Sequence, residues 1–475
     1  MAENFKTSEA FLEEVAEQIS YRPLRPAIVS ELQDHIEERI GEYQNEGYSR
    51  EQAEQKAVAA MGDPVVIGTE INAVRHVRSN PVLVVLTAVL MLAGLAAAVY
   101  INWTPEQYVN GFGYYLPGLA VLLAASFYSY PLLVKYWKRM LLLILVLFIA
   151  GILSSLYHQS NMLNSYLFDR GYDLPRYLLN YFSWRGAYYA ALILGSLLTV
   201  AIYSYRHHSR RLFFFFAVAE FWILLSATTG EQLSAIAVFV ISFVGTILFM
   251  FSKKLFNGKF YLLFPLLLVV TFLSLPYQKE RFQEFTAQQD TIYSVWDDAY
   301  NGVLIRELLS KTPITSELSL TPTEMINYGT GNWYFGTDVK RLYPDENTVT
   351  LWDILPQHYH NNYLLAVGIF MFGWLFGFLC LAVIGAFFLT IFRCVFLIRG
   401  KLASCMAFNC AMVLLVQTML YIAGNLGYQY EYFTNLPLVS EGKISIVINM
   451  LLLGFIFSAY RYDKMIEEPA SFRVI

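Results

Sequence analysis

The stretch LPYQKERFQEFTAQQD, residues 275–290, ends an apolar region and opens the one long hydrophilic interruption within the hydrophobic part of the chain. The interruption runs from Pro276 to Asn362, where the sequence becomes strongly apolar again. A loop of this length between apolar segments is more often functional than a simple connection. We therefore expect any chemistry that this protein performs to lie within residues 276–362.

The composition is that of a membrane protein. Of the 475 residues, 56% are hydrophobic and 15% are charged, whereas soluble proteins carry roughly 25% charged residues. We therefore expect an all-α protein that crosses the membrane many times. The net charge of −4 is too small to indicate a partner, and no basic stripe or recognition motif indicates nucleic-acid binding.

Two further expectations follow from local composition. The cysteines lie in or beside apolar runs without metal-ligand spacing, so we expect small buried side chains at Cys380, Cys394, Cys405 and Cys410. We expect no signal peptide, because the N-terminal segment is polar and helical and lacks an early apolar core.

Residues 1–78 predict a small soluble helical bundle. One segment carries Phe11, Leu12, Val15 and Ile19 at helical spacing, and a second carries Val29, Leu32, Ile36, Ile40 and Tyr43. The capping-box sequence Ser49–Gln52 predicts the start of a third helix, which Gly62-Asp63-Pro64 should end. The segments at 32–38, 46–49 and 59–64 resemble the permease prefix, or HAAS, domain, which implies a cytoplasmic module that regulates an attached membrane protein.

Beyond residue 79 the hydropathy predicts about ten membrane spans, each long enough to cross a hydrocarbon core of roughly 30 Å. Their expected positions are 81–101, 116–134, 139–156, 186–204, 211–228, 232–251, 260–275, 364–392, 403–424 and 443–460. Lysine and arginine gather in alternate short connections, which is the positive-inside pattern. We therefore expect both termini in the cytoplasm, the 276–362 loop outside, a transmembrane domain at 79–465 and a cytoplasmic tail at 466–475.

The loop and the segments that follow it resemble the SEDS family of FtsW, RodA and SpoVE. The resemblance rests on LPYQ at 275–278 with Arg281, GTGNWYFG at 329–336, LP at 355–356 before HNNYLLA at 360–366, and LPLVSEG at 436–442. It implies a fold of about ten helices with a large extracellular loop after the seventh. It also implies polymerisation of the lipid-linked precursor lipid II into peptidoglycan during division, elongation or sporulation, together with a single-span transpeptidase of the penicillin-binding class.

Glycan polymerisation needs a base for the attacking sugar hydroxyl and positive charge for the departing pyrophosphate. The family resemblance places the catalytic aspartate at Asp290, and Asp297 and Asp298 compete for the role. Lys279 and Arg281 are candidate phosphate partners on the same stretch.

Near the last span, Ser440 and Lys443 are candidate substrate contacts, although Lys443 can instead pair with Glu441. We expect no cofactor, and no residue pattern indicates a divalent cation.

Glu220 is a further candidate because it interrupts an almost wholly apolar span. A carboxylate within the membrane is costly, so its presence suggests a function such as lining a path for a lipid substrate.

Three functions stay open at this point. Asp290 and the LPLVSEG motif favour a glycosyltransferase, and Glu220 suits a transporter of lipid-linked precursors. The loss of acidic residues at motif positions, for example at Asn362, favours a non-catalytic scaffold or regulator.

Overall fold

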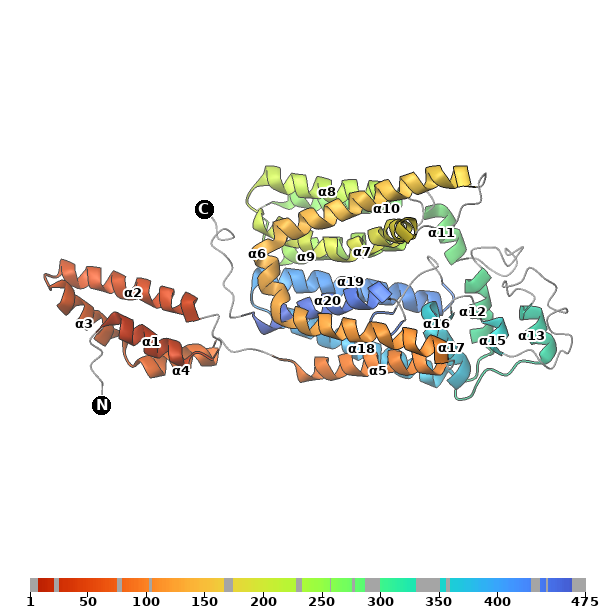
Figure 1. The fold of residues 1–475 in the computed structure, drawn as a ribbon, viewed down its shortest axis with the longest axis horizontal. Coiled ribbons are helices and arrows are strands. Elements are labelled where there is room, and N and C mark those ends of the chain that lie inside the picture. Colours follow the sequence, from red (N-terminus) through yellow and green to blue (C-terminus); the bar gives the residue numbers. More distant parts are fainter. Residues whose placement is uncertain are drawn as a thin grey trace. The chain divides into compact units, whose positions relative to one another are not determined.

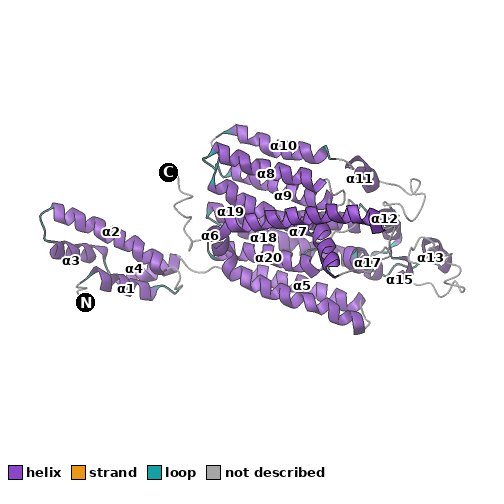
Figure 2. Ribbon diagram, turned by 45° about the horizontal axis from the view of Figure 1, so that its top comes forward, coloured by secondary structure: helices purple, strands orange, loops and turns teal. Residues whose placement is uncertain are grey.

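The computed structural model describes residues 7–20, 25–74, 79–101, 105–165, 174–227, 233–256, 258–275, 278–286, 300–329, 351–355, 359–428, 436–440 and 443–463. All regular elements in these ranges are helices (Figure 2), so the predicted all-α class is confirmed. The chain divides into two compact units, Met1–Ser79 and Asn80–Ala459, with the C-terminal residues shared between them.

The first unit contains four helices, α1 Ser8–Gln18, α2 Arg25–Asn45, α3 Arg50–Met61 and α4 Pro64–Val74. Its core holds Phe11, Leu12 and Val15 of the first predicted stripe and Ile36 of the second. The remaining residues of the second stripe pack at the edge of this core. The stripes are confirmed, but α4 was missed because Gly62-Asp63-Pro64 ends one helix and immediately begins another.

Side chains fix the ends of these helices. Ser49 and Gln52 form both hydrogen bonds of the predicted capping box, and Gly62 ends α3 with a φ of 97°. The Asp63 carboxylate then accepts the Val65 N–H at 2.8 Å at the start of α4. Ser8 donates from its hydroxyl and its backbone N–H to Glu54 at 2.6 and 2.9 Å, which joins α1 to α3 and lowers the pKa of Glu54.

The second unit is a bundle of long apolar helices with shorter helices at one end (Figure 1). The apolar helices of the bundle are α5 Pro81–Ile101, α6 Pro105–Ser165, α7 Leu174–Ser204, α8 Ser209–Ala227, α9 Leu233–Ser252, the shorter α10 Leu263–Leu273, α18 Trp374–Leu397, α19 Lys401–Asn425 and α20 Lys443–Arg461. The short ones are η2 Lys259–Leu262, α11 Gln278–Phe285, α12 Tyr300–Lys311, α13 Pro322–Gly329, α15 Leu351–Ile354, α16 Tyr359–Asn362 and α17 Leu364–Phe372.

Within the described residues, five helices are long and apolar enough to cross a membrane. They are Tyr115–Val146, Leu233–Ser252, Trp374–Leu397, Lys401–Asn425 and Ile444–Arg461. Three shorter apolar helices, Pro81–Ala97, Tyr189–Ser204 and Leu263–Leu273, accompany them. The multi-pass architecture is confirmed, and the number of about ten spans stays a prediction.

The two predicted spans at 116–134 and 139–156 lie in one continuous helix, α6, rather than in two helices. A straight helix of 61 residues would measure about 90 Å, roughly three times the thickness of the hydrocarbon core. Figure 1 shows α6 bending back in its middle section. The helix contains Pro131, which cannot donate a backbone hydrogen bond, and the exposed Lys135, Lys138 and Arg139 follow it. The chain therefore reverses direction without a break in the helix.

The predicted span at 364–392 is also corrected, because Gly373 divides it into α17 and α18. Gly373 has a φ of 82°, a conformation that disfavours any residue with a Cβ. A Cβ there would also lie 2.7 Å from the Ile314 carbonyl oxygen. The break is thus specified both by backbone conformation and by a segment of the distant loop.

A buried amide joins three helices in the bundle centre. Asn409 of α19 accepts a hydrogen bond from the Ser196 hydroxyl of α7 at 3.0 Å and donates to the Thr246 hydroxyl of α9 at 3.0 Å. All three side chains are fully buried. Polar contacts of this kind fix how apolar helices pack, because hydrophobic burial does not distinguish protein from lipid tails.

Candidate functional site

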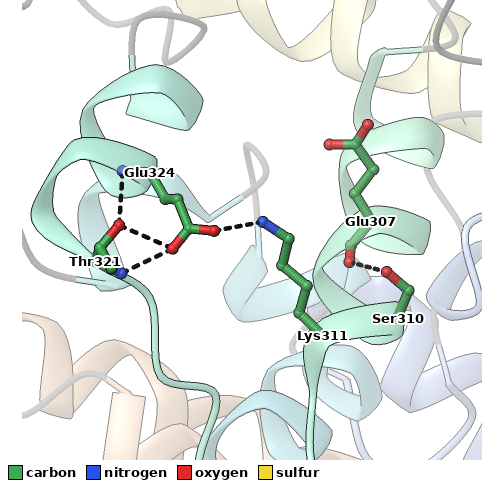
Figure 3. Close-up of polar contacts among 5 residues, drawn as sticks. All are labelled: Glu307, Ser310, Lys311, Thr321 and Glu324. Carbon is green, nitrogen blue, oxygen red and sulfur yellow. Dashed lines mark hydrogen bonds and ion pairs between the residues drawn. The ribbon is translucent and has the colours of Figure 1, made fainter.

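The described part of the 276–362 loop is built from short helices. Helix α12 buries Val303, Leu304, Ile305, Leu308 and Leu309. The Thr321 hydroxyl caps α13, and the Glu324 carboxylate accepts hydrogen bonds from the Thr321 N–H and hydroxyl at 2.9 Å each. Lys311 at the end of α12 bonds the other carboxylate oxygen at 2.8 Å (Figure 3), so two loop helices are held together. The contact with Lys311 and the bonds from Thr321 lower the pKa of Glu324 to about 2.

The loop also supplies backbone partners to the break between α17 and α18. The N–H groups of Trp374 and Leu375 donate to the carbonyls of Pro313 and Ile314 at 3.1 and 2.8 Å. The Leu318 N–H donates to the Phe370 carbonyl at 2.7 Å. Since the first N–H groups of a helix lack partners within it, the loop completes the start of α18.

Asn425 joins the end of the loop to α19. Its side-chain N–H donates to the Asn362 carbonyl at 2.8 Å, and its side-chain oxygen accepts the Ala366 N–H at 3.0 Å. Asn362 and Ala366 are four residues apart, so in a continuous helix they would bond each other. The Asn425 amide is inserted between them, at the junction of α16 and α17, and replaces that missing bond.

The LPLVSEG motif begins with a buried turn, Leu436 to Ser440. The Ser440 hydroxyl accepts the Leu436 N–H at 2.9 Å, and Leu438 has a φ of 72°, which is unusual for a leucine. The Tyr115 hydroxyl of α6 donates to the Val439 carbonyl at 2.9 Å. The turn is thus held in one conformation by its own serine and by a distant tyrosine.

Tyr421, which the sequence reasoning did not single out, lies on α19 one turn before Asn425. Its side chain is fully buried beside Ser440. The Tyr421 hydroxyl thus lies among Ser440, Asn425 and the start of α17. The one sequence signal was its spacing of four residues from Asn425, which places both on one face of α19.

The predicted catalytic group is only partly covered by the structure. Asp290 and its competitors Asp297 and Asp298 lie outside the described residues, as does Glu441. Lys279 is exposed on α11, Arg281 lies on the same helix, and Lys443 is the first residue of α20. The catalytic role of Asp290 and the substrate contacts of Arg281 and Ser440 stay predictions.

Glu220 faces a groove of about 340 Å³ between α8 and α10. The described residues that line this α8–α10 groove are Phe213, Phe216, Ala217, Glu220, Phe221, Leu224, Phe264, Leu267 and Leu268. Glu220 alone among them is ionisable. The groove is therefore apolar apart from one carboxyl group.

Among the described residues, no group of three or more histidine, cysteine, aspartate or glutamate side chains is arranged to hold a metal ion. Among the described cysteines, Cys394, Cys405 and Cys410 are buried, as expected from the sequence, and Cys380 is partly exposed.

Comparison with known proteins agrees with the motifs, although no family model matches the chain. The probable peptidoglycan glycosyltransferase FtsW of Thioalkalivibrio sp. (strain K90mix) is 29% identical over 167 residues, which are 33% of this chain and 38% of that relative. The match thus spans about two fifths of the length of the relative. A solved structure, described as "Structural coordination of polymerization and crosslinking by a peptidoglycan synthase complex", contains a chain with the same fold. It has a TM-score of 0.50 and 15% identity, covering 81% of this chain and 98% of that chain.

Proposed function

We propose that this membrane protein, whose sequence is similar in part to an FtsW and whose fold is that of a chain in a peptidoglycan synthase complex, belongs to the SEDS family and is a peptidoglycan glycosyltransferase that polymerises lipid II. The function would serve cell division, elongation or sporulation. The observation that carries the proposal is the junction of two motif segments of the chain. Asn425 of α19 forms hydrogen bonds with the HNNYLLA segment. One turn earlier on α19, the Tyr421 side chain lies beside Ser440, which belongs to the buried turn of LPLVSEG.

In this mechanism Asp290 takes the proton of the attacking sugar hydroxyl, as a general base within hydrogen-bond reach can do. Lys279 and Arg281 hold the developing charge of the leaving pyrophosphate. Ser440 and Lys443 contact the substrate from the last helix. The protein residues supply both base and positive charge, so the proposal requires no cofactor.

The proposed topology follows from the charge pattern of the sequence. Both termini lie in the cytoplasm of a bacterial cell and the 276–362 loop lies outside, where glycan strands are assembled. The partner is a single-span transpeptidase of the penicillin-binding class, which would cross-link the new strands. The helices of residues 1–78 act as a regulatory prefix of the HAAS type.

The test is polymerisation of purified lipid II by the full-length protein with its transpeptidase partner. Wild type should form glycan strands, and Asp290→Asn should form none. Glu317→Gln changes an exposed acid of the same loop and serves as the matched control, which should retain activity.

The other outcomes separate the alternatives. Equal product from wild type and Asp290→Asn would move the base to Asp297 or Asp298. No product from folded wild type with bound partner would refute the transferase, and a lipid II flipping assay in liposomes would then distinguish a transporter from a scaffold.

A further inference from the structure

The α8–α10 groove has a floor and a rim of different exposure. Phe216 and Leu268 are 1% exposed and form the floor, whereas Phe213 and Phe221 are 62% and 61% exposed and form the rim. Figures 1 and 2 both show α8 and α10 side by side at one edge of the bundle. The groove therefore opens toward the space that lipid occupies around a membrane protein.

The carboxyl group is the unusual feature of this groove. One oxygen of the Glu220 carboxyl, Oε1, is buried without a hydrogen-bond partner among the described residues, while the Thr271 hydroxyl of α10 contacts the same carboxyl group. A buried polar atom without a partner costs roughly 1–3 kcal/mol, and more when it is charged. A ligand that supplied a positive charge or a hydrogen-bond donor at this oxygen would remove that cost.

The aromatic walls favour a positive charge. Phe216 and Phe264 stack across the two helices with centroids 4.1 Å apart and form an aromatic floor, so the rings exposed to a ligand are those of Phe213 and Phe221 at the rim. Phenylalanine rings attract ammonium groups through their negative faces, and ammonium recognition by clustered aromatic rings is a recurrent arrangement in proteins. One carboxyl group among several phenylalanines has the components of such a site.

We propose that the α8–α10 groove binds an amphiphile with an ammonium group on a single hydrocarbon chain. The ammonium lies between Glu220 and the phenylalanine rings, and the chain lies along Leu224 and Leu267. Glu220 is nine residues beyond the exposed Arg211, about 14 Å along α8, so a ligand must be lipophilic to reach it. The proposal does not depend on the glycosyltransferase function.

Two other occupants fit less well. A transmembrane helix packs closely against several small residues, but Ala217 is the one small residue among the described lining. An anionic lipid headgroup would find no lysine or arginine among the described lining residues to hold its charge. The groove thus favours a cation over the lipid-substrate path expected for Glu220 from the sequence.

The test is equilibrium dialysis of the full-length protein in a neutral detergent with radiolabelled dodecyltrimethylammonium. Wild type should bind the probe saturably, and Glu220→Gln should weaken binding about tenfold or more, the effect expected for losing a desolvated charge contact. Phe213→Leu should also weaken binding. Phe214→Leu is the matched control, because Phe214 is equally exposed at 60% but does not line the groove.

Competition identifies the ligand chemistry. Dodecanol, which has the same chain without the charge, should displace the probe poorly, and so should geranylgeranyl pyrophosphate. Equal displacement by dodecanol would show a groove for hydrocarbon alone, and displacement by the pyrophosphate that depends on Glu220 would support the substrate path instead. Unchanged binding in Glu220→Gln, or equal losses in Phe213→Leu and Phe214→Leu, would also overturn the proposal.

Discussion

Replacing Asn425 with leucine tests whether its amide completes the interrupted helix between α16 and α17. Leucine is of similar size, so the substitution removes the hydrogen bonds without leaving a large cavity. The Ala366 N–H and the Asn362 carbonyl, in residues that are 0% and 4% exposed, lose the partners that Asn425 provides. The Tyr421 carbonyl, which also accepts from Asn425 at 2.9 Å, lies inside α19 and keeps its place in the helix.

The magnitude follows from the Ala366 N–H, which loses its partner. A buried polar group left without a hydrogen bond costs roughly 1–3 kcal/mol, so Asn425→Leu should lower the free energy of unfolding by about 1 to 3 kcal/mol. The assay is equilibrium unfolding in mixed micelles with increasing dodecyl sulfate, followed by circular dichroism. Ser404→Ala is the matched control on α19, because the buried Ser404 hydroxyl has no hydrogen-bond partner among the described residues and its loss should cost almost nothing.

A loss below about 0.5 kcal/mol for Asn425→Leu would refute the reasoning. It would mean that Ala366 and Asn362 move together and form the direct bond of a continuous helix, whose net value is roughly 0.5–1.5 kcal/mol. A large loss with equal loss in Ser404→Ala would refute it as well, since α19 would then tolerate no substitution and the amide would have no special role.

Two further predictions concern packing and pH. Gly195→Ala should destabilise the bundle by about 1–3 kcal/mol in the same unfolding assay, because a Cβ there would lie 3.0 Å from the Asn409 side-chain oxygen. Gly385→Ala is the control and should be neutral, because a Cβ at Gly385 would have no neighbouring atom within 4 Å. Because the folded pKa of Glu324 is about 2, the stabilisation from its contact with Lys311 is present above the unfolded value near 4.3 and is lost as pH falls toward about 2. The melting temperature of Glu324→Gln should therefore lie below that of wild type at neutral pH and converge with it over this acidic range; a constant difference at all pH values would contradict this.

Hydropathy located several helices of the bundle to within a few residues. The spans predicted at 81–101, 232–251, 403–424 and 443–460 correspond to Pro81–Ile101, Leu233–Ser252, Lys401–Asn425 and Lys443–Arg461. The sequence also predicted the capping box at Ser49 and the apolar stripes of α1 and α2, since caps and stripes depend on residues only a few positions apart. The proposed catalytic group came from motif resemblance, and the position of Asp290 stays a prediction.

Hydropathy did not predict where a helix breaks or where it reverses direction. Gly373 is an ordinary residue of an apolar span in the sequence, and it becomes a break because the Pro313 and Ile314 carbonyls accept the N–H groups that follow it. The turn within α6 lies in a segment whose charges were interpreted as a short connection between two helices. In both places the backbone conformation depends on contacts or geometry that hydropathy does not contain.

The sequence by itself determined which segments are apolar enough to lie in lipid, because a bilayer core demands about 20 consecutive apolar residues whatever their neighbours are. Only the tertiary structure decided which partner each buried polar group has. Asn425 bonds residues 59 and 63 positions away, and Asn409 bonds residues 213 and 163 positions away. A hydrogen bond forms only when donor and acceptor meet at the right distance and angle, and the packing of whole helices sets that geometry.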